Sequence, residues 1–309
     1  MLSDSYRDCR DQLERGGIEN PAFEAQCMLE HLTGYNRAAQ LAHGGEPFAQ
    51  QKALDEMVRR RLRHEPLQYI LGSWSFCGFP LSVGEGVLIP RDDTEVVLGL
   101  CLDYLKKRRW ALSPVYSNHG DQDNRLQRRD PAISNHVKHL PDAVAADLCS
   151  GSGALAIALS KIAGARVTAV ELSKAALPYL IRNVQENEAD VTVREGDVLH
   201  CHTQFQDESL DLIVSNPPYI RSADIAALQD EVQFEPRMAL DGGESGYDFY
   251  EALIPLWKGK LKRGGALAFE LGEGQAETVG ALMKAHGFEN IRTAEDFGGI
   301  QRAIIGTVL

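Results

Sequence analysis

The corner Asn216-Pro217-Pro218-Tyr219 holds the residues best suited to chemistry, and it follows the apolar run 210–215. That run contains two β-branched residues and predicts a buried strand. Each proline fixes its own φ, lacks a backbone N–H and keeps the residue before it out of the right-handed helical region. We therefore expect a stiff, extended turn at the carboxyl end of a strand, where no helix begins at once and occupies the backbone carbonyl groups.

Such a corner can hold a planar amide or amine. The two N–H groups of the substrate nitrogen can donate to the side-chain oxygen of Asn216 and to the backbone carbonyl of Pro217. The flat face of the substrate group can lie on Tyr219, so that the nitrogen lone pair points out of that plane toward an electrophile. The alternative is an ordinary turn, because Asn-Pro often opens turns. The apolar strand before the tetrapeptide and the glycine-rich loop upstream favour the binding role.

The glycine-rich loop is expected to approach a cofactor, and its residues are Asp147, Leu148, Cys149, Ser150, Gly151, Ser152 and Gly153. Glycine has no Cβ, so Gly151 and Gly153 let the backbone come close to a ligand. Glu171 ends the next predicted strand, about 20 residues further on, where a carboxylate can accept hydrogen bonds from ribose hydroxyl groups. Asp197 follows the third strand within reach of an adenine amino group, and Val198 would lie beside the adenine ring.

The second half of the chain has the alternating pattern of strands and helices that is typical of a parallel α/β sheet. The predicted strands are 145–149, 166–171, 191–195, 210–215, 266–271, 290–293 and 303–308, and the predicted helices are 154–163, 174–186, 249–258 and 275–286. Ligands in open α/β sheets bind at the carboxyl ends of the strands. The loop, Glu171, Asp197 and Asn216 fall there on successive strands, so we expect a nucleoside site.

The loop by itself leaves two other interpretations open. One is a plain strand-to-helix turn. The other is a nicotinamide cofactor, because Ala156 occupies the third position of a G-x-G-x-x-G/A pattern. The proline corner argues against hydride transfer, since it puts a site for an amide where the hydride acceptor would lie.

Three parts are expected along the chain. The first is helical, with Asn20-Pro21 and Glu46-Pro47 as helix starts, and we expect it to dock a substrate or to act as a lid. The second mixes aromatic and β-branched pieces with glycines, which predicts a β-hairpin linker. The third is the α/β domain, in which Asp93 or Thr94 is expected to cap a helix over 95–107. The boundaries are 1–66, 67–92 and 93–309, with a polar insert at about 107–143 whose basic run leaves a nucleic-acid tether open.

Composition narrows the class of protein. The net charge of −12 weighs against duplex DNA as a partner, because DNA affinity comes largely from Lys and Arg at the phosphates. The six cysteines are scattered without a C-x-x-C pair, which disfavours a zinc site or a disulfide framework, and we expect no metal at His200-Cys201-His202. No signal peptide and no stretch long enough for a bilayer are recognised, so we expect a cytoplasmic, reduced protein.

Taken together, the motifs resemble those of the peptide chain release factor glutamine methyltransferases. The resemblance covers nearly the whole chain except roughly 107–143, and it is carried in order by 65–72, 89–95, the cofactor loop, the Asn-Pro-Pro-Tyr corner, Phe234-Glu235-Pro236 and Ala239-Leu240. Two features depart from the family pattern. Cys149-Ser150 stands where the family more often has Gly-Thr, and Phe76-Cys77-Gly78 is closer to the ribosomal-protein glutamine methyltransferases.

The resemblance implies a class I methyltransferase with a Rossmann-like α/β sheet and a small N-terminal helical domain. It implies S-adenosyl-L-methionine as cofactor and methyl transfer to the side-chain amide N5 of the Gln in the Gly-Gly-Gln motif of class 1 peptide chain release factors. Asn216, Pro217, Pro218 and Tyr219 would then be catalytic, and Asn216 would also border the cofactor. Neither a membrane nor direct nucleic-acid binding is implied. The alternatives are a ribosomal-protein glutamine methyltransferase, a nucleic-acid adenine methyltransferase, or a binding protein that has lost activity.

Overall fold

The N-terminal part of the protein is a small helical bundle. The computed structural model describes residues 1–112 and 143–309, and in it the first helices are α1 (Leu2–Arg15), α2 (Pro21–Thr33), α3 (Arg37–Ala42) and α4 (Gln51–Arg61). The helix start at Asn20-Pro21 is confirmed, with Asn20 as the N-cap of α2. The start at Glu46-Pro47 is wrong: α4 begins at Gln51. The carbonyl of Glu46 accepts the N–H of Leu2 at 2.9 Å, so it is committed to α1 and not to a first turn of α4.

The segment between the bundle and the sheet contains both a helix and a hairpin. The helix α5 (Leu67–Leu71) precedes the antiparallel strands β1 (Ser73–Phe76) and β2 (Phe79–Ser82). The predicted hairpin is therefore present, but Tyr69 and Ile70, predicted as part of it, are helical. Their N–H groups donate to the carbonyl of Pro66 at 3.0 and 3.1 Å, and Gly72 ends the helix in the left-handed region with φ 72°.

The C-terminal part is built on one seven-stranded sheet with the order β5-β4-β3-β6-β7-β9-β8. The strands are β3 (Val144–Leu148), β4 (Arg166–Glu171), β5 (Val191–Glu195), β6 (Leu210–Ser215), β7 (Leu261–Glu270), β8 (Glu289–Glu295) and β9 (Gln301–Thr307). The expected parallel α/β sheet is confirmed from β5 to β7, and at the other edge β9 runs antiparallel to both β7 and β8. A tight turn after β8 reverses the chain there: Oδ1 of Asp296 accepts the N–H groups of Gly298 and Ile300.

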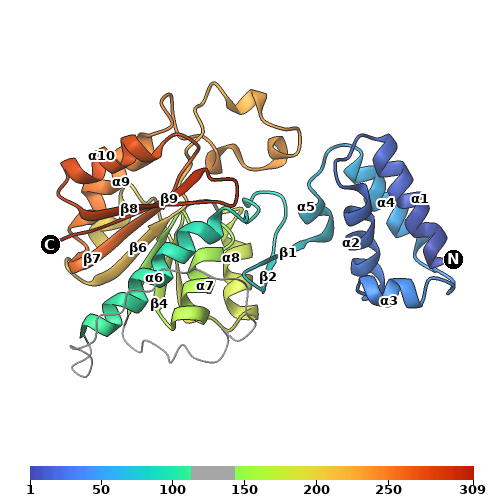
Figure 1. Cartoon of the computed structure of the whole chain (residues 1–309), viewed down its shortest axis with the longest axis horizontal. Helices are drawn as coiled ribbons and strands as arrows, with labels where there is room; N and C mark the ends of the chain where they lie inside the picture. Colours follow the sequence, from blue (N-terminus) through green and yellow to red (C-terminus); the bar gives the residue numbers. More distant parts are fainter. Residues whose placement is uncertain (113–142) are drawn as a thin grey trace.

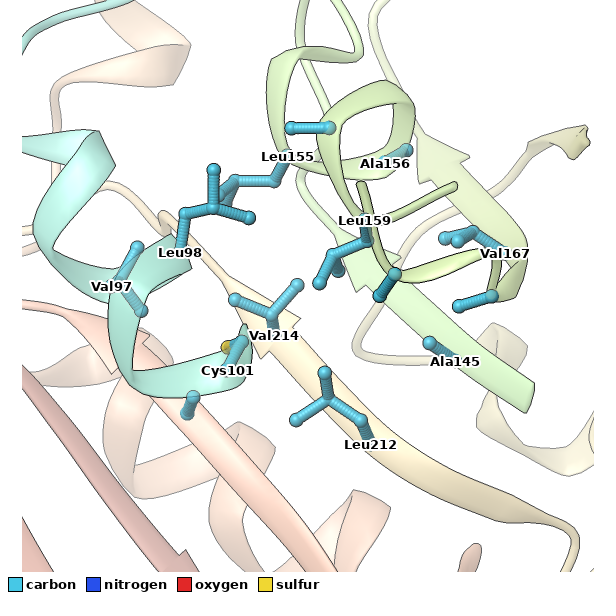
Figure 2. Packing of buried hydrophobic residues seen from close by; sticks show 14 of the residues in the cluster. Val97, Leu98, Cys101, Ala145, Leu155, Ala156, Leu159, Val167, Leu212 and Val214 are labelled. Atoms are coloured by element: carbon cyan, nitrogen blue, oxygen red, sulfur yellow. The ribbon is translucent and has the colours of Figure 1, made fainter. Parts of the chain in front are cut away.

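Helices cover both faces of the sheet (Figure 1). They are α6 (Thr94–Leu112), α7 (Ala154–Ala163) and α8 (Leu177–Glu186) on one face, and α9 (Asp248–Lys258) and α10 (Ala276–Ala285) on the other. Figure 2 shows the first face, where Leu98 of α6 and Leu159 of α7 meet Val214 of β6 in a fully buried layer. Trp257 of α9 is completely buried on the second face. Because both faces are covered, only the strand ends remain open to a ligand.

Two further expectations concern the helix over 95–107 and the polar insert that follows it. The helix predicted for 95–107 continues as α6 to Leu112. The polar insert expected at 107–143 lies largely outside the described residues. Within the described ranges, no helix is both long enough and apolar enough to cross a membrane. The boundaries proposed at residues 66 and 92 stay a prediction.

Candidate functional site

A pocket of about 1080 Å³, including its open mouth, lies at the carboxyl ends of the central strands. Its walls include the residues after β3, β4, β5 and β6, together with a segment before α6 and a segment before α9. The predicted site residues on these walls are Asp147, Cys149, Ser150, Gly151, Ser152, Glu171, Asp197, Val198, Asn216 and Pro218. The carboxyl edge that the sequence indicates is thus where the side chains converge.

The cofactor loop is held in a conformation with three left-handed residues. Cys149, Gly151 and Gly153 have φ of 60°, 54° and 87°. A Cβ on Gly151 would meet no atom within 4 Å, whereas one on Gly153 would lie 2.6 Å from the side chain of Leu180. Gly151 therefore presents bare backbone to open space, and Gly153 permits close packing of the loop against α8. Cys149 takes the left-handed region without being glycine, which is strained for a side chain with a Cβ.

Asp147 is an incompletely satisfied buried carboxyl group at the floor of the pocket. It is 1% exposed, and its Oδ2 accepts the N–H of Ala156 at 3.1 Å. Its Oδ1 has no hydrogen-bond partner within the part of the chain that the structure describes. Burial raises the pKa of Asp147 to about 7. A cationic ligand in the pocket would supply the missing partner and favour the ionised form.

Glu171 stands at the end of β4 and faces the same pocket. Its Oε2 accepts the N–H of Gly151 at 2.7 Å, and its Oε1 accepts the N–H of Ser173 at 2.7 Å. A carboxylate oxygen can accept two hydrogen bonds, so each oxygen keeps capacity for one more donor. The arrangement fits a pair of adjacent hydroxyl groups such as those of a ribose.

Asp197 and Val198 form the wall beyond β5. Oδ1 of Asp197 accepts the N–H of Leu199 at 2.9 Å, and Oδ2 lies 2.8 Å from Nδ1 of His200. The apolar side chains of Val198 and Leu199 line the pocket beside this carboxylate. A flat apolar ring with an amino group at its edge, such as adenine, matches these neighbours.

The proline corner contributes Asn216 and Pro218 to the pocket. Nδ2 of Asn216 donates to Oγ1 of Thr94 at 3.5 Å, and Thr94 itself lines the pocket. Tyr219 does not line it: its phenol donates to Oε1 of Glu270 at 3.3 Å, at the end of β7. The proposed stacking of a substrate on Tyr219 therefore stays a prediction.

Three other predicted site residues also lie outside the pocket lining. Leu148 is completely buried in the core between the sheet and the helices α9 and α10, so its side chain faces these helices and not a ligand. Gly153 is the N-cap of α7 and acts through packing. Pro217 is likewise absent from the lining, so the acceptor role expected for its backbone carbonyl stays a prediction.

Sequence reasoning gave no site role to several residues that shape the pocket. They are Ile89, Pro90, Thr94, Pro236, Met238, Ala239 and Phe249. Glu235 joins two of these segments: its Oε2 accepts the N–H of Ile89 at 2.9 Å, and it forms an ion pair with Arg91. The motifs at 89–95 and 234–236 can be recognised in the sequence. Their contact joins residues 146 positions apart, so no local pattern predicts it.

Metal ligation finds no support in the geometry. Within 1–112 and 143–309, no group of three or more His, Cys, Asp or Glu side chains is placed to hold an ion. In the cluster considered from the sequence, Cys201 is buried in the core and His200 is taken up by Asp197. All six cysteines are free thiols.

Comparison with known proteins finds similar sequences for both the N-terminal and the C-terminal part of the chain. Residues 4–72 match the family model described as the PrmC N-terminal domain, and residues 127–239 match the Methyltransferase small domain. The release factor glutamine methyltransferase of Geobacter sulfurreducens is 37% identical over 304 residues, covering 97% of this chain and 94% of that protein. The enzyme of the same name from Moorella thermoacetica is 34% identical over 300 residues, covering 95% and 94%. Among solved structures, a methyltransferase from Pyrococcus furiosus matches with a TM-score of 0.42 at 20% identity, over 53% of this chain and 74% of that chain, a likeness too distant to bear on function.

The fold and the pocket define a class I methyltransferase that uses S-adenosyl-L-methionine, with an α/β sheet and an N-terminal helical part. Within that class, the chain belongs to the release factor glutamine methyltransferase family.

Proposed function

We propose that this protein methylates the side-chain amide N5 of the Gln in the Gly-Gly-Gln motif of class 1 peptide chain release factors. The observation that carries the proposal is the placement of Asn216. It lies on the pocket wall at the end of β6, next to the cofactor loop, and its Nδ2 is turned to Thr94. Its Oδ1 is then the atom left to accept a hydrogen bond from a substrate amide. The names of the relatives support the choice of substrate.

Three carboxyl groups would hold the cofactor, which supplies an electrophilic methyl group when bound. Asp147 offers its unpartnered Oδ1 to the positive charge of the methionine part. Glu171 accepts hydrogen bonds from the ribose hydroxyls, and Asp197 accepts one from the adenine amino group. The three side chains come from successive strand ends, so a bound nucleoside would be held along this edge of the sheet, whose pocket Asn216 also lines.

The corner prepares an unreactive nitrogen for attack. The lone pair of an amide nitrogen is delocalised, so positive charge develops on the nitrogen as it forms a new bond. Oδ1 of Asn216 and the carbonyl of Pro217 accept the two N–H groups, stabilise that charge and fix the direction of approach. No backbone N–H in the described ranges donates to the Pro217 carbonyl, which is therefore free to do so. The methylated nitrogen is a stronger acid than the amide, and its extra proton leaves after transfer.

The proposed partner is a protein surface. The net charge of −12 weighs against duplex nucleic acid, and we expect neither nucleic acid nor a membrane to take part. Because the proposed substrate is a translation factor, the proposed reaction takes place in the cytoplasm.

The test is a direct competition between substrates. The purified protein is incubated with methyl-labelled S-adenosylmethionine and, in parallel, a release factor, a ribosomal-protein mixture and duplex DNA. We expect label only in the release factor, and mass spectrometry should place one methyl group on the Gln of the Gly-Gly-Gln tryptic peptide. A release factor with Asn in place of that Gln is the matched control and should stay unlabelled. Label in the ribosomal proteins or the DNA, with none in the release factor, would overturn the proposal.

A further inference from the structure

A buried polar row lies behind the pocket wall, and the mechanism above does not use it. Glu270 ends β7 and is 1% exposed. Its Oε1 accepts the phenol proton of Tyr219 at 3.3 Å. Its Oε2 is buried with no hydrogen-bond partner of ordinary geometry among the described residues, and Thr94 is the side chain that most lowers the pKa of this carboxyl group. Thr94 in turn accepts from Nδ2 of Asn216.

The direction of the hydrogen bonds along this row decides which atom of Asn216 faces the substrate. A hydroxyl has one proton to donate, whereas an ionised carboxylate can only accept. If Glu270 is ionised, Thr94 donates to Glu270 and has only its lone pairs left for Asn216. Asn216 must then turn its Nδ2 to Thr94, which leaves Oδ1 toward the pocket.

A protonated Glu270 removes that constraint. It can donate to Thr94, and the hydroxyl proton of Thr94 is then free to turn toward Asn216. The amide of Asn216 can flip so that Oδ1 accepts from Thr94 and Nδ2 faces the pocket. An N–H group would then oppose the N–H groups of a substrate amide, and the corner would lose its acceptor.

We propose that Glu270 is a positioning residue for methyl transfer: as a carboxylate, it orients Asn216 through Thr94 so that Oδ1 is presented to the substrate. This inference rests on the proposed role of Asn216 and deepens it. Glu270 does not line the pocket, so no contact with the substrate or the cofactor is assigned to it.

The surroundings of Glu270 bring the pKa of its carboxyl group close to neutral pH. Burial is the largest influence and raises its pKa to about 7, while Thr94 and Tyr219 oppose that rise by hydrogen bonding. The charged groups that face it are Asp93 at the start of α6, which raises its pKa further, and Arg302 of β9, which lowers it. Tyr250 of α9 donates to its backbone carbonyl. The carboxyl group of Glu270 therefore changes charge near neutral pH, and the donor and acceptor roles along the row change with it.

The experiment measures kcat as a function of pH at saturating cofactor and release factor. The wild-type kcat should rise as pH increases through about 7. Glu270→Gln keeps the shape but places an N–H donor in the row, so it should imitate the protonated state. We expect its kcat to be lower by about tenfold above neutrality, as a reversed hydrogen bond costs, and to lose its pH dependence. Thr94→Val should behave in the same way, and Thr94→Ser should restore both rate and pH profile.

Cofactor affinity separates this positioning role from a general loss of structure. The dissociation constant for S-adenosylmethionine should be unchanged in Glu270→Gln, because Glu270 does not line the pocket. A wild-type kcat and pH profile in Glu270→Gln would overturn the proposal, and so would a Thr94→Ser variant as slow as Thr94→Val. If these variants are normal while Asn216→Ala is inactive, only the positioning role fails. If Asn216→Ala is itself fully active, the proposed mechanism fails first.

Discussion

Arg61 of α4 forms an ion pair with Glu231, which lies in the segment between the proline corner and α9. The Arg61 side chain is 3% exposed, and it also pairs with Glu24 of α2 at 2.6 Å. Figure 1 shows the segment before α9 reaching from the sheet toward the N-terminal helices. The same segment supplies Pro236 and Met238 to the pocket. One buried guanidinium thus connects the helical bundle to a wall of the active site.

The two carboxylates on Arg61 should differ in their effect on stability. Arg61→Ala leaves Glu24 buried without its partner, and we expect the free energy of unfolding to fall by about 3–5 kcal/mol, as for a broken buried pair. Glu231→Gln removes a carboxylate that is 42% exposed, so its effect should stay within about 1 kcal/mol. Denaturant unfolding of both variants, followed by circular dichroism, checks the difference. Equal losses in the two would show that Arg61 gains its stabilisation from the active-site segment and not from the bundle.

One substitution should separate the role of the proline corner in turnover from the binding of the cofactor. Asn216→Ala removes the proposed acceptor of the substrate amide, and we expect turnover to fall by about 100- to 1,000-fold, as for loss of one preorganised charge-stabilising group. The cofactor should bind with an unchanged dissociation constant, because the three carboxyl groups assigned to it are intact. Single-turnover kinetics and calorimetry measure the two quantities. Full turnover in Asn216→Ala would end the amide-holding mechanism.

Glu171 should show the opposite pattern. Glu171→Ala removes the acceptor proposed for the ribose and also the acceptor of the Gly151 N–H, so the loop loses a fixed point. We expect the cofactor dissociation constant to rise by about 10- to 100-fold, the value of one or two hydrogen bonds to a charged group. The turnover number at saturating cofactor should change far less. Glu171→Gln, which keeps one acceptor oxygen, should lie between, and calorimetry that finds wild-type affinity in Glu171→Ala would remove the ribose assignment.

Local patterns were enough to place the part of the sheet that carries the site. The bounds of β4, β5, β6 and α7 agree with those expected, because each is an apolar or β-branched segment bounded by glycine, polar or proline residues. The order of strand ends then brings Glu171, Asp197 and Asn216 to one edge. These positions follow from chain direction and alternation, which a sequence displays directly.

Contacts between distant segments could not be anticipated in this way. Tyr69 is helical because its N–H and its neighbour's donate to Pro66, and its phenol donates to Val87 at 2.6 Å. An aromatic residue next to glycines favours a strand by propensity, and this tertiary bond overrides that preference. Thr94 had a sufficient explanation as a helix cap, so its position between Asn216 and Glu270 carried no signal of its own.

Cofactor affinity should depend on pH through Asp147. Its pKa is raised from 3.8 to about 7 by burial, so the folded protein binds more protons than the unfolded chain between these values. The free energy of unfolding without cofactor should therefore decrease as pH rises through this window, with Glu270 contributing in the same direction from 4.5 to about 7. A cationic cofactor favours the ionised form, so its affinity should increase with pH and level off above about 7. Calorimetric titration across this range, with Asp147→Asn as control, is the measurement: the variant should bind more weakly and lose the pH dependence, and a wild-type affinity that falls with pH would contradict the assignment.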